Sequence, residues 1–264
     1  MLFFALYLAT GLFAGFLAGL LGVGGGLVIV PVLAMIFAAA HFPAEHIMHL
    51  ALGTSLASIL FTSISSLRAH HAHGAANWQV VRGISPGIVV GTLLGTLLAA
   101  QLSTFFLKVF FIVFIYYVAA QMLLNIKPKP SRQLPGAAGL FAAGGVIGGV
   151  SSLVGIGGGT LSVPFMTWCN VKLHQAIGTS AAIGFPIAAA GALGFVLNGL
   201  MAQNLPEYSW GFVYLPALAG LVVASVLTAP LGAKLAHRLP VAKLKKIFAA
   251  LLLVLGTRML VSLW

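Results

Sequence analysis

The stretch GVGGG at residues 22–26, followed by Pro31, recurs as GIGGG at residues 155–159, followed by Pro164. Both copies lie within long apolar sequence, where a run of glycines disfavours a continuous helix because glycine loses the most backbone freedom on ordering. Self-similarity of this kind indicates that the chain contains two copies of one structural unit. The two glycine motifs therefore predict an internal duplication with an interrupted helix in each copy.

A second motif follows each glycine motif at matched spacing. His49 and the GTS sequence at residues 53–55 correspond to His174 and the GTS sequence at residues 178–180. A basic, proline-rich stretch at residues 127–135 separates the copies and is typical of a linker. We therefore expect one membrane domain made of two transmembrane repeats, residues 1–130 and residues 131–264.

The composition predicts an all-α integral membrane protein. Apolar residues make up 61% of the chain, charged residues make up 6%, and the mean hydropathy is +1.12. A soluble domain carries about 25% charged residues. The apolar runs approach the roughly 20 residues that cross a bilayer as helix, and the alternating pattern of a membrane β-barrel is absent.

Each half of the chain contains five apolar segments. They cover residues 2–21, 27–40, 47–66, 83–102 and 104–126, then 136–154, 160–170, 176–198, 211–233 and 241–263. Because five is odd, the second repeat must enter the membrane in the opposite orientation to the first. The second segment of each half is too short to cross, since residues 27–40 would form a helix only ~21 Å long. We expect broken or re-entrant helices at the glycine motifs and between 6 and 10 spans.

The distribution of charge predicts the orientation. If the loop at residues 67–82 is cytoplasmic, 11 of the 13 basic residues fall inside, and Lys108 and Arg258 alone fall outside. Glu45 and Glu207 also fall outside, in agreement with the positive-inside rule. We therefore expect a multi-pass protein of the inner (plasma) membrane with both termini on the outer, periplasmic side.

The glycine motifs are candidate substrate-binding elements. Non-helical backbone at membrane depth is tolerated only where protein buries it or where it lines a cavity, and paired interruptions in inverted halves mark transporter sites. Freed amide groups and a helix N-terminus direct partial positive charge toward an anion. The candidates are Gly24, Gly25, Gly26, Gly157, Gly158 and Gly159. The alternative is close helix packing by small residues.

Hydroxyl and imidazole groups extend this candidate site. Thr54, Ser55, Thr179 and Ser180 could donate hydrogen bonds to oxyanion atoms, or could instead bond their own backbone one turn earlier. His49 and His174 lie four residues before the glycine of each GTS sequence and so share a helix face with the hydroxyl pair. Their protonation would couple transport to pH, whereas a helix-end histidine in the interfacial zone is the alternative.

Several functions are excluded by what the sequence lacks. Glu45 and Glu207 both lie in loops, which leaves no carboxylate at membrane depth for a proton relay or a cation site. No nucleophile elbow, phosphate-binding loop or zinc-protease motif occurs, so we expect no enzyme activity, no metal site and no cofactor. Cys169 is the single cysteine. The scattered basic residues form no stripe for nucleic acid. His70, His71 and His73 are expected to be solvated.

The duplicated glycine motif with its following proline and the duplicated GTS sequence resemble the sulfite exporter TauE/SafE family, also called the toluene sulfonate uptake permeases. The resemblance covers nearly the whole chain. It implies a permease for sulfite, organosulfonates or related anions, with the substrate region at the glycines and hydroxyl residues named above. Thr160 replaces the apolar residue found at Leu27, so the two half-sites are not expected to be identical.

The leading hypothesis is a secondary transporter that exports sulfite or a small sulfonate by alternating access between the two halves. The alternatives are an uncoupled anion channel or facilitator, and a membrane subunit that assists an enzyme complex without moving solute. The expected partners are a small anionic substrate and the lipid bilayer. A homodimer is compatible with the sequence.

Overall fold

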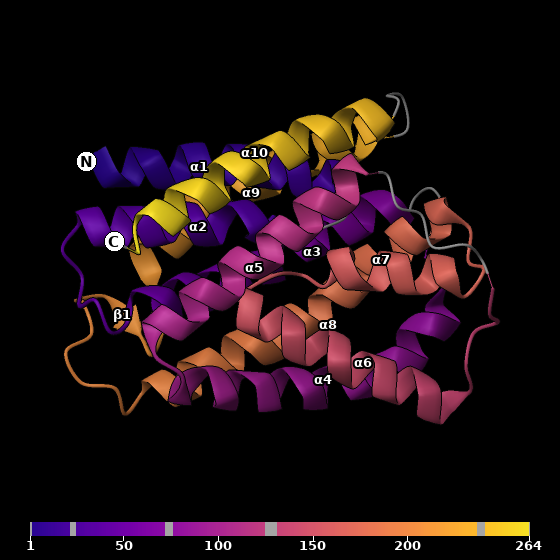
Figure 1. The fold of residues 1–264 in the computed structure, drawn as a ribbon, viewed down its shortest axis with the longest axis horizontal. Coiled ribbons are helices and arrows are strands. Elements are labelled where there is room, and N and C mark those ends of the chain that lie inside the picture. The colour runs from indigo at the N-terminus through magenta and orange to yellow at the C-terminus, as the bar shows by residue number, and fades with distance from the viewer. Residues whose placement is uncertain (1, 22–24, 72–75, 125–130, 237–240, 264) are drawn as a thin grey trace.

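The computed structural model describes residues 2–21, 25–71, 76–124, 131–236 and 241–263. Within these ranges the first half forms α1 (Leu2–Leu21), α2 (Gly26–Ala39), α3 (Ile47–His71), α4 (Trp78–Gln101) and α5 (Thr104–Leu123). The second half forms α6 (Ala137–Val154), α7 (Gly159–Trp168), α8 (Leu173–Gly199), α9 (Leu215–Ala236) and α10 (Val241–Val261). These helices coincide with the ten predicted apolar segments, so the all-helical architecture is confirmed (Figure 1). A short antiparallel pair, β1 (Ser209–Trp210) and β2 (Val213–Tyr214), was not predicted.

The described helices are those of a multi-pass membrane protein. Seven of them, α1, α3, α4, α5, α6, α8 and α9, hold an apolar run long enough to cross a membrane. Their outer faces are apolar, since Val113, Val146 and Leu227 are each more than half exposed. Such a surface is stable against hydrocarbon and not against water. The spans α3 and α8 are the most buried and form the centre of the molecule.

Two short helices follow breaks at the glycine motifs, as the sequence predicts. α2 has 14 residues and α7 has 10. Gly25 precedes α2 with a φ of 76°, and Gly158 precedes α7 with a φ of 77°. Both angles lie in the left-handed region that favours glycine, because a side chain there would clash with the backbone. The glycines therefore set the points at which α2 and α7 begin.

The α6–α7 segment forms a hairpin that begins and ends at the same end of the molecule. The backbone N–H groups of Ser131 and Arg132 donate to the Trp168 carbonyl at 3.3 and 3.4 Å. The N-terminus of α1 and the chain after α2 lie at the opposite end (Figure 1). Where the two hairpins meet, a Cβ added to Gly26 would overlap the Gly155 carbonyl oxygen. The two glycine motifs therefore converge in the interior from opposite ends.

The helices pack into two units that each combine both halves of the chain. The most extensive contacts join α1 to α9 and α4 to α6, and further contacts join α9 to α3 and α4 to α8. The first unit therefore comprises α1, α2, α3 and α9, and the second comprises α4, α6, α7 and α8. Exchanging each helix for its counterpart in the other half converts one unit into the other. Figure 1 shows α1, α2 and α9 above α4, α6 and α8.

Glycines permit the close packing inside both units. On α1, a Cβ at Gly11 would lie 2.7 Å from the Leu221 carbonyl oxygen of α9. On α4, a Cβ at Gly91 would overlap the Gly145 carbonyl oxygen of α6. Backbone contact through small residues is the usual way in which membrane helices associate, since lipid provides little hydrophobic drive. The fourth helix of each half is thus held against the first helix of the other half.

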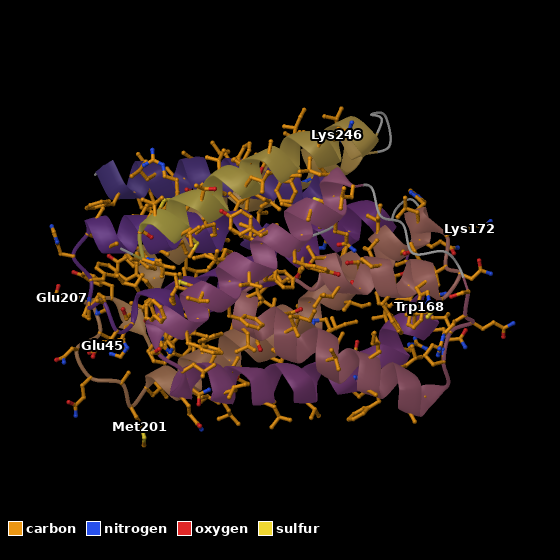
Figure 2. The ribbon with its side chains drawn as sticks, in the orientation of Figure 1. Glu45, Trp168, Lys172, Met201, Glu207 and Lys246 are labelled. Atoms are coloured by element: carbon orange, nitrogen blue, oxygen red, sulfur yellow. The ribbon has the colours of Figure 1, made fainter. Side chains whose placement is uncertain are left out.

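The two ends of the molecule differ in charge. Glu45 and Glu207 lie at one end, and Lys172 lies at the other (Figure 2). Both chain termini lie at the end that carries the glutamates (Figure 1). We call these the glutamate end and the lysine end. Helix direction places Arg68 and Lys234, near the last turns of α3 and α9, toward the lysine end.

Candidate functional site

The residues predicted to bind substrate gather around the α3–α8 crossing. Those that the structure describes there are all buried: Gly25, Gly26, Thr54, Ser55, Gly157, Gly158, Gly159, Thr179 and Ser180. Gly24 lies outside the described residues. The structure therefore brings the two glycine motifs and the two GTS sequences into one interior region.

Ser55 joins the two units through a hydrogen bond. Its Oγ–H on α3 donates to the Gly155 carbonyl at 2.8 Å, and both groups are buried. Gly155 ends α6 with a φ of 69°, so its carbonyl is directed away from the helix. This is the same carbonyl against which Gly26 packs. Ser55 and Gly26 of the first half thus both meet the glycine motif of the second half at the Gly155 carbonyl.

The two threonines accept hydrogen bonds at the starts of α9 and α4. We call these the swapped helices, because each packs mainly against helices of the other half of the chain. The Tyr214 N–H, one residue before α9, donates to Thr54 Oγ1 at 2.9 Å. The Asn77 N–H, one residue before α4, donates to Thr179 Oγ1 at 2.9 Å. The first amides of a helix have no partner within it, so a side-chain acceptor stabilises the helix start. Thr54 acts within the first unit and Thr179 within the second.

Two serines that the sequence analysis missed join this region. Ser162 Oγ on α7 donates to Ser180 Oγ on α8 at 3.0 Å. Ser151 on α6 is fully buried and its Oγ has no hydrogen-bond partner among the described residues. The sequence could have indicated both serines by their proximity to the second glycine motif. Ser151 precedes that motif by four residues and Ser162 follows it by three.

The two histidines lie at opposite ends of the molecule, so they do not form one cluster with the hydroxyl groups. His49 is buried near the glutamate end, where its Nε2 bonds the Ala99 carbonyl at 3.0 Å and its ring lies 4.9 Å from that of Phe212. It lines an open cavity of about 500 Å³ with Glu45 and His46. His174 is exposed, one residue into α8 at the lysine end. The structure does not bring the histidines together.

A small, partly open cavity of about 20 Å³ lies between the two units. The hydroxyl residues Thr62, Ser63 and Ser66 of α3 line it from the first unit. Gly157 and Ser180 line it from the second unit. Space of this size holds about one water molecule. Thr62, Ser63 and Ser66 were not predicted, although Ser55, Ser58, Thr62 and Ser66 recur at helical spacing and so share one face of α3.

The described residues contain no cluster of three or more histidine, cysteine or acidic side chains that could hold a metal ion. Cys169 is buried at the end of α7, and burial raises the pKa of its thiol. The side chains of His70, His71 and His73 lie outside the described part of the chain. Where the two glycine motifs meet, the described polar groups include the Ser55, Ser162 and Ser180 hydroxyls and the Gly155 carbonyl.

Comparison with known proteins identifies similar sequences along nearly the whole chain. Residues 7–259 match the family model described as sulfite exporter TauE/SafE. A probable membrane transporter protein of Haemophilus influenzae is 39% identical over 259 residues, covering 97% of this chain and 98% of that protein. One from Methanocaldococcus jannaschii is 26% identical over 268 residues, covering 98% and 96%. No solved structure matches.

Proposed function

Because this chain belongs to the sulfite exporter TauE/SafE family, we propose that it transports small sulfur-containing anions, sulfite or organosulfonates, across the inner membrane. The observation that carries the proposal is the meeting of two glycine-rich helix breaks in the protein interior, where Gly26 packs against the Gly155 carbonyl that also accepts the Ser55 hydrogen bond. Irregular backbone of this kind at membrane depth is characteristic of transporter binding sites.

The electrostatics favour an anionic cargo. The chain has two carboxylates, Glu45 and Glu207, and both lie in loops at the glutamate end, outside the seven candidate spans. A cation crossing the membrane would need carboxylate or dense carbonyl oxygen along its path. Hydroxyl and amide donors instead suit oxyanions. Exposed Arg68, Lys172 and Lys234 would concentrate anions at the lysine end.

The packing supports alternating access between inverted repeats. The two units are counterparts of each other, and their first hairpins enter from opposite ends of the molecule. The threonine hydrogen bonds lie within each unit, whereas the Ser55–Gly155 bond lies between them. We therefore propose that the units rock against each other along the α3–α8 contact, each carrying its swapped fourth helix. In this mechanism the two bodies that move are the packed units, each of which contains helices from both halves of the sequence.

Flux measurements test the nature of the cargo. Purified protein in liposomes should give saturable sulfite uptake that methanesulfonate inhibits, and no flux of magnesium or tetramethylammonium above protein-free liposomes. Saturation follows because each transport cycle requires a bound cargo. Flux that rises linearly with sulfite concentration would indicate a channel, inactivity of the purified protein would favour an accessory subunit, and cation flux would contradict the electrostatic argument.

Cysteine labelling tests the inverted orientation. Glu45→Cys and Lys172→Cys, each in a Cys169→Ser background, place exposed thiols just before α3 and α8. These two helices are equivalent and begin at opposite ends of the molecule (Figure 2). A membrane-impermeant maleimide should label position 45 in intact cells and position 172 only after permeabilisation, since the basic end is expected inside. Labelling of both positions from one side would refute the inverted repeat.

A further inference from the structure

We propose that the cavity between α3 and α8 is the cargo site and that it selects monovalent oxyanions. This inference rests on the transport function proposed above. It assigns the cargo to the Ser66 hydroxyl and its neighbours. Ser66 lies about one and a half turns from the end of α3, just before Arg68, and about three turns beyond the GTS sequence.

Ser66 is the observation that points to a ligand. Its side chain is 5% exposed, it lines the cavity, and its Oγ has no hydrogen-bond partner among the described residues. A buried hydroxyl without a partner is unfavourable, and most such groups in proteins are satisfied. A bound oxyanion would supply the missing acceptor. Ser63, by contrast, already donates to the Leu60 carbonyl at 2.9 Å.

Further donors surround the same space. Thr62 Oγ1 lies 2.8 Å from Ser225 Oγ of α9, and Ser180 Oγ accepts from Ser162. Hydroxyl hydrogens rotate, so these groups can redirect a donor when an acceptor arrives. Gly157 contributes backbone, two residues before α7, whose first amides lack partners within the helix. The partial positive charge of that helix start is directed toward bound anions.

The internal duplication supplies a comparison. With the two GTS sequences aligned, Thr62, Ser63 and Ser66 correspond to Ile187, Ala188 and Gly191. Those positions are buried and apolar, and a Cβ on Gly191 would lie 2.7 Å from Leu56 Cδ1. The equivalent positions of α8 thus pack in the interior without hydroxyl groups. Packing alone does not require Thr62 and Ser66 to be polar, which favours a role in binding.

Charge determines which anions the cavity accepts. None of the described residues that line it is titratable. The titratable groups described on the helices around it are Tyr7, His49, Arg68, Arg82, His174 and Lys234, and of these Tyr7 and His49 lie toward the glutamate end while the others are exposed. Dipoles alone must therefore replace the water around the ion. The cost of removing that water grows with the square of the charge, roughly fourfold from a monovalent to a divalent ion, so hydrogen sulfite and sulfonates are favoured over divalent sulfite.

The volume of the cavity links binding to movement. About 20 Å³ admits a water molecule and excludes a sulfur oxyanion. Ala18 and the hydroxyl residues of α3 belong to the first unit, whereas Gly157, Ser180 and Gly184 belong to the second. Separation of the two units therefore enlarges the cavity. The rocking motion that alternating access requires is the same motion that makes room for the cargo.

Two substitutions test the site. Ser66→Ala removes the unpartnered hydroxyl, and Gly184→Ala adds a methyl group in ordinary contact, 3.4 Å from the Gly157 oxygen and 3.7 Å from Ser63 Cβ. Both variants should keep the thermal stability of the wild type and raise the half-saturating concentration of methanesulfonate by about tenfold or more. Ser66→Ala should also be as stable as the wild type or more stable, because no partner is lost.

Matched controls come from α4 and α6. Thr92→Val removes another fully buried hydroxyl that has no partner among the described residues, and Gly149→Ala adds a methyl group 3.5 Å from the Gly91 oxygen. Neither residue lines the cavity, so both controls should transport like the wild type. If Ser66→Ala and Gly184→Ala also transport sulfite and methanesulfonate like the wild type, the cargo site lies elsewhere. That result would leave the proposed transport function unaffected.

The pH dependence tests the selection of charge. In wild-type liposomes at fixed total sulfite, uptake should rise as pH falls and hydrogen sulfite replaces divalent sulfite. Uptake of methanesulfonate, which stays monovalent, should not change over the same range. A parallel change for both anions would assign the titration to the protein and refute selection of the monovalent form. Wild-type protein that moves neither anion would overturn the proposed function itself.

Discussion

Gly26→Ala should abolish anion flux and destabilise the fold. A Cβ at this position would overlap the Gly155 carbonyl oxygen and lie 2.9 Å from the Ile156 Cα. Both are backbone atoms of a motif whose own φ angles restrict movement. Overpacking costs about 1–3 kcal/mol, and more where the neighbour cannot yield. Thermal unfolding in detergent and liposome flux would measure the two effects.

The control for this variant is Gly145→Ala on α6. There the added Cβ would lie 3.9 Å from the Gly87 oxygen, which is ordinary contact. Alanine also favours helix over glycine by about 1 kcal/mol, so this variant should be at least as stable as the wild type. Wild-type stability and flux in Gly26→Ala would show that the two glycine motifs need not touch, contrary to the arrangement on which the transport proposal depends.

The second large effect is expected for the Thr54→Val/Thr179→Val double variant. Each substitution removes the acceptor of a backbone N–H at the start of a swapped helix, that of Tyr214 or that of Asn77. An unsatisfied donor costs about 1–3 kcal/mol. Because the two bonds lie in different units, the costs should add to about 2–6 kcal/mol. Thermal unfolding of both single variants and the double variant measures this sum.

Serine provides the matched control at these positions. Thr54→Ser/Thr179→Ser keeps both hydroxyl acceptors and should recover most of the stability that valine loses. A direct role in binding cargo makes a different prediction, in which the valine variants stay stable and lose only affinity for sulfite. An unfolding temperature equal to that of the wild type in the valine double variant would contradict the role of these hydroxyls in stabilising the helix starts. It would favour a role in binding cargo instead.

The sequence by itself determined the all-helical membrane architecture and the positions of the helix breaks. Length and hydropathy of each segment are local properties, and the short runs at residues 27–40 and 160–170 became α2 and α7. Glycine at positions 25 and 158 marked the start of both helices because those backbones adopt positive φ. The separation of Glu45 and Glu207 from Lys172 likewise follows from the order of charged loops along the chain.

The tertiary structure alone decided which helices pair and what each hydroxyl does. Small residues line several helices, so the sequence allows many pairings, and only shape complementarity between distant segments selects α1 with α9 and α4 with α6. A serine in an apolar helix has the same local sequence signal whether it bonds its own backbone, another helix or nothing. On α3, Ser63 bonds its own backbone, Ser55 bonds the Gly155 carbonyl, and Ser66 has no partner among the described residues. Their difference arises because the partner, or the lack of one, is supplied by atoms far away in the chain.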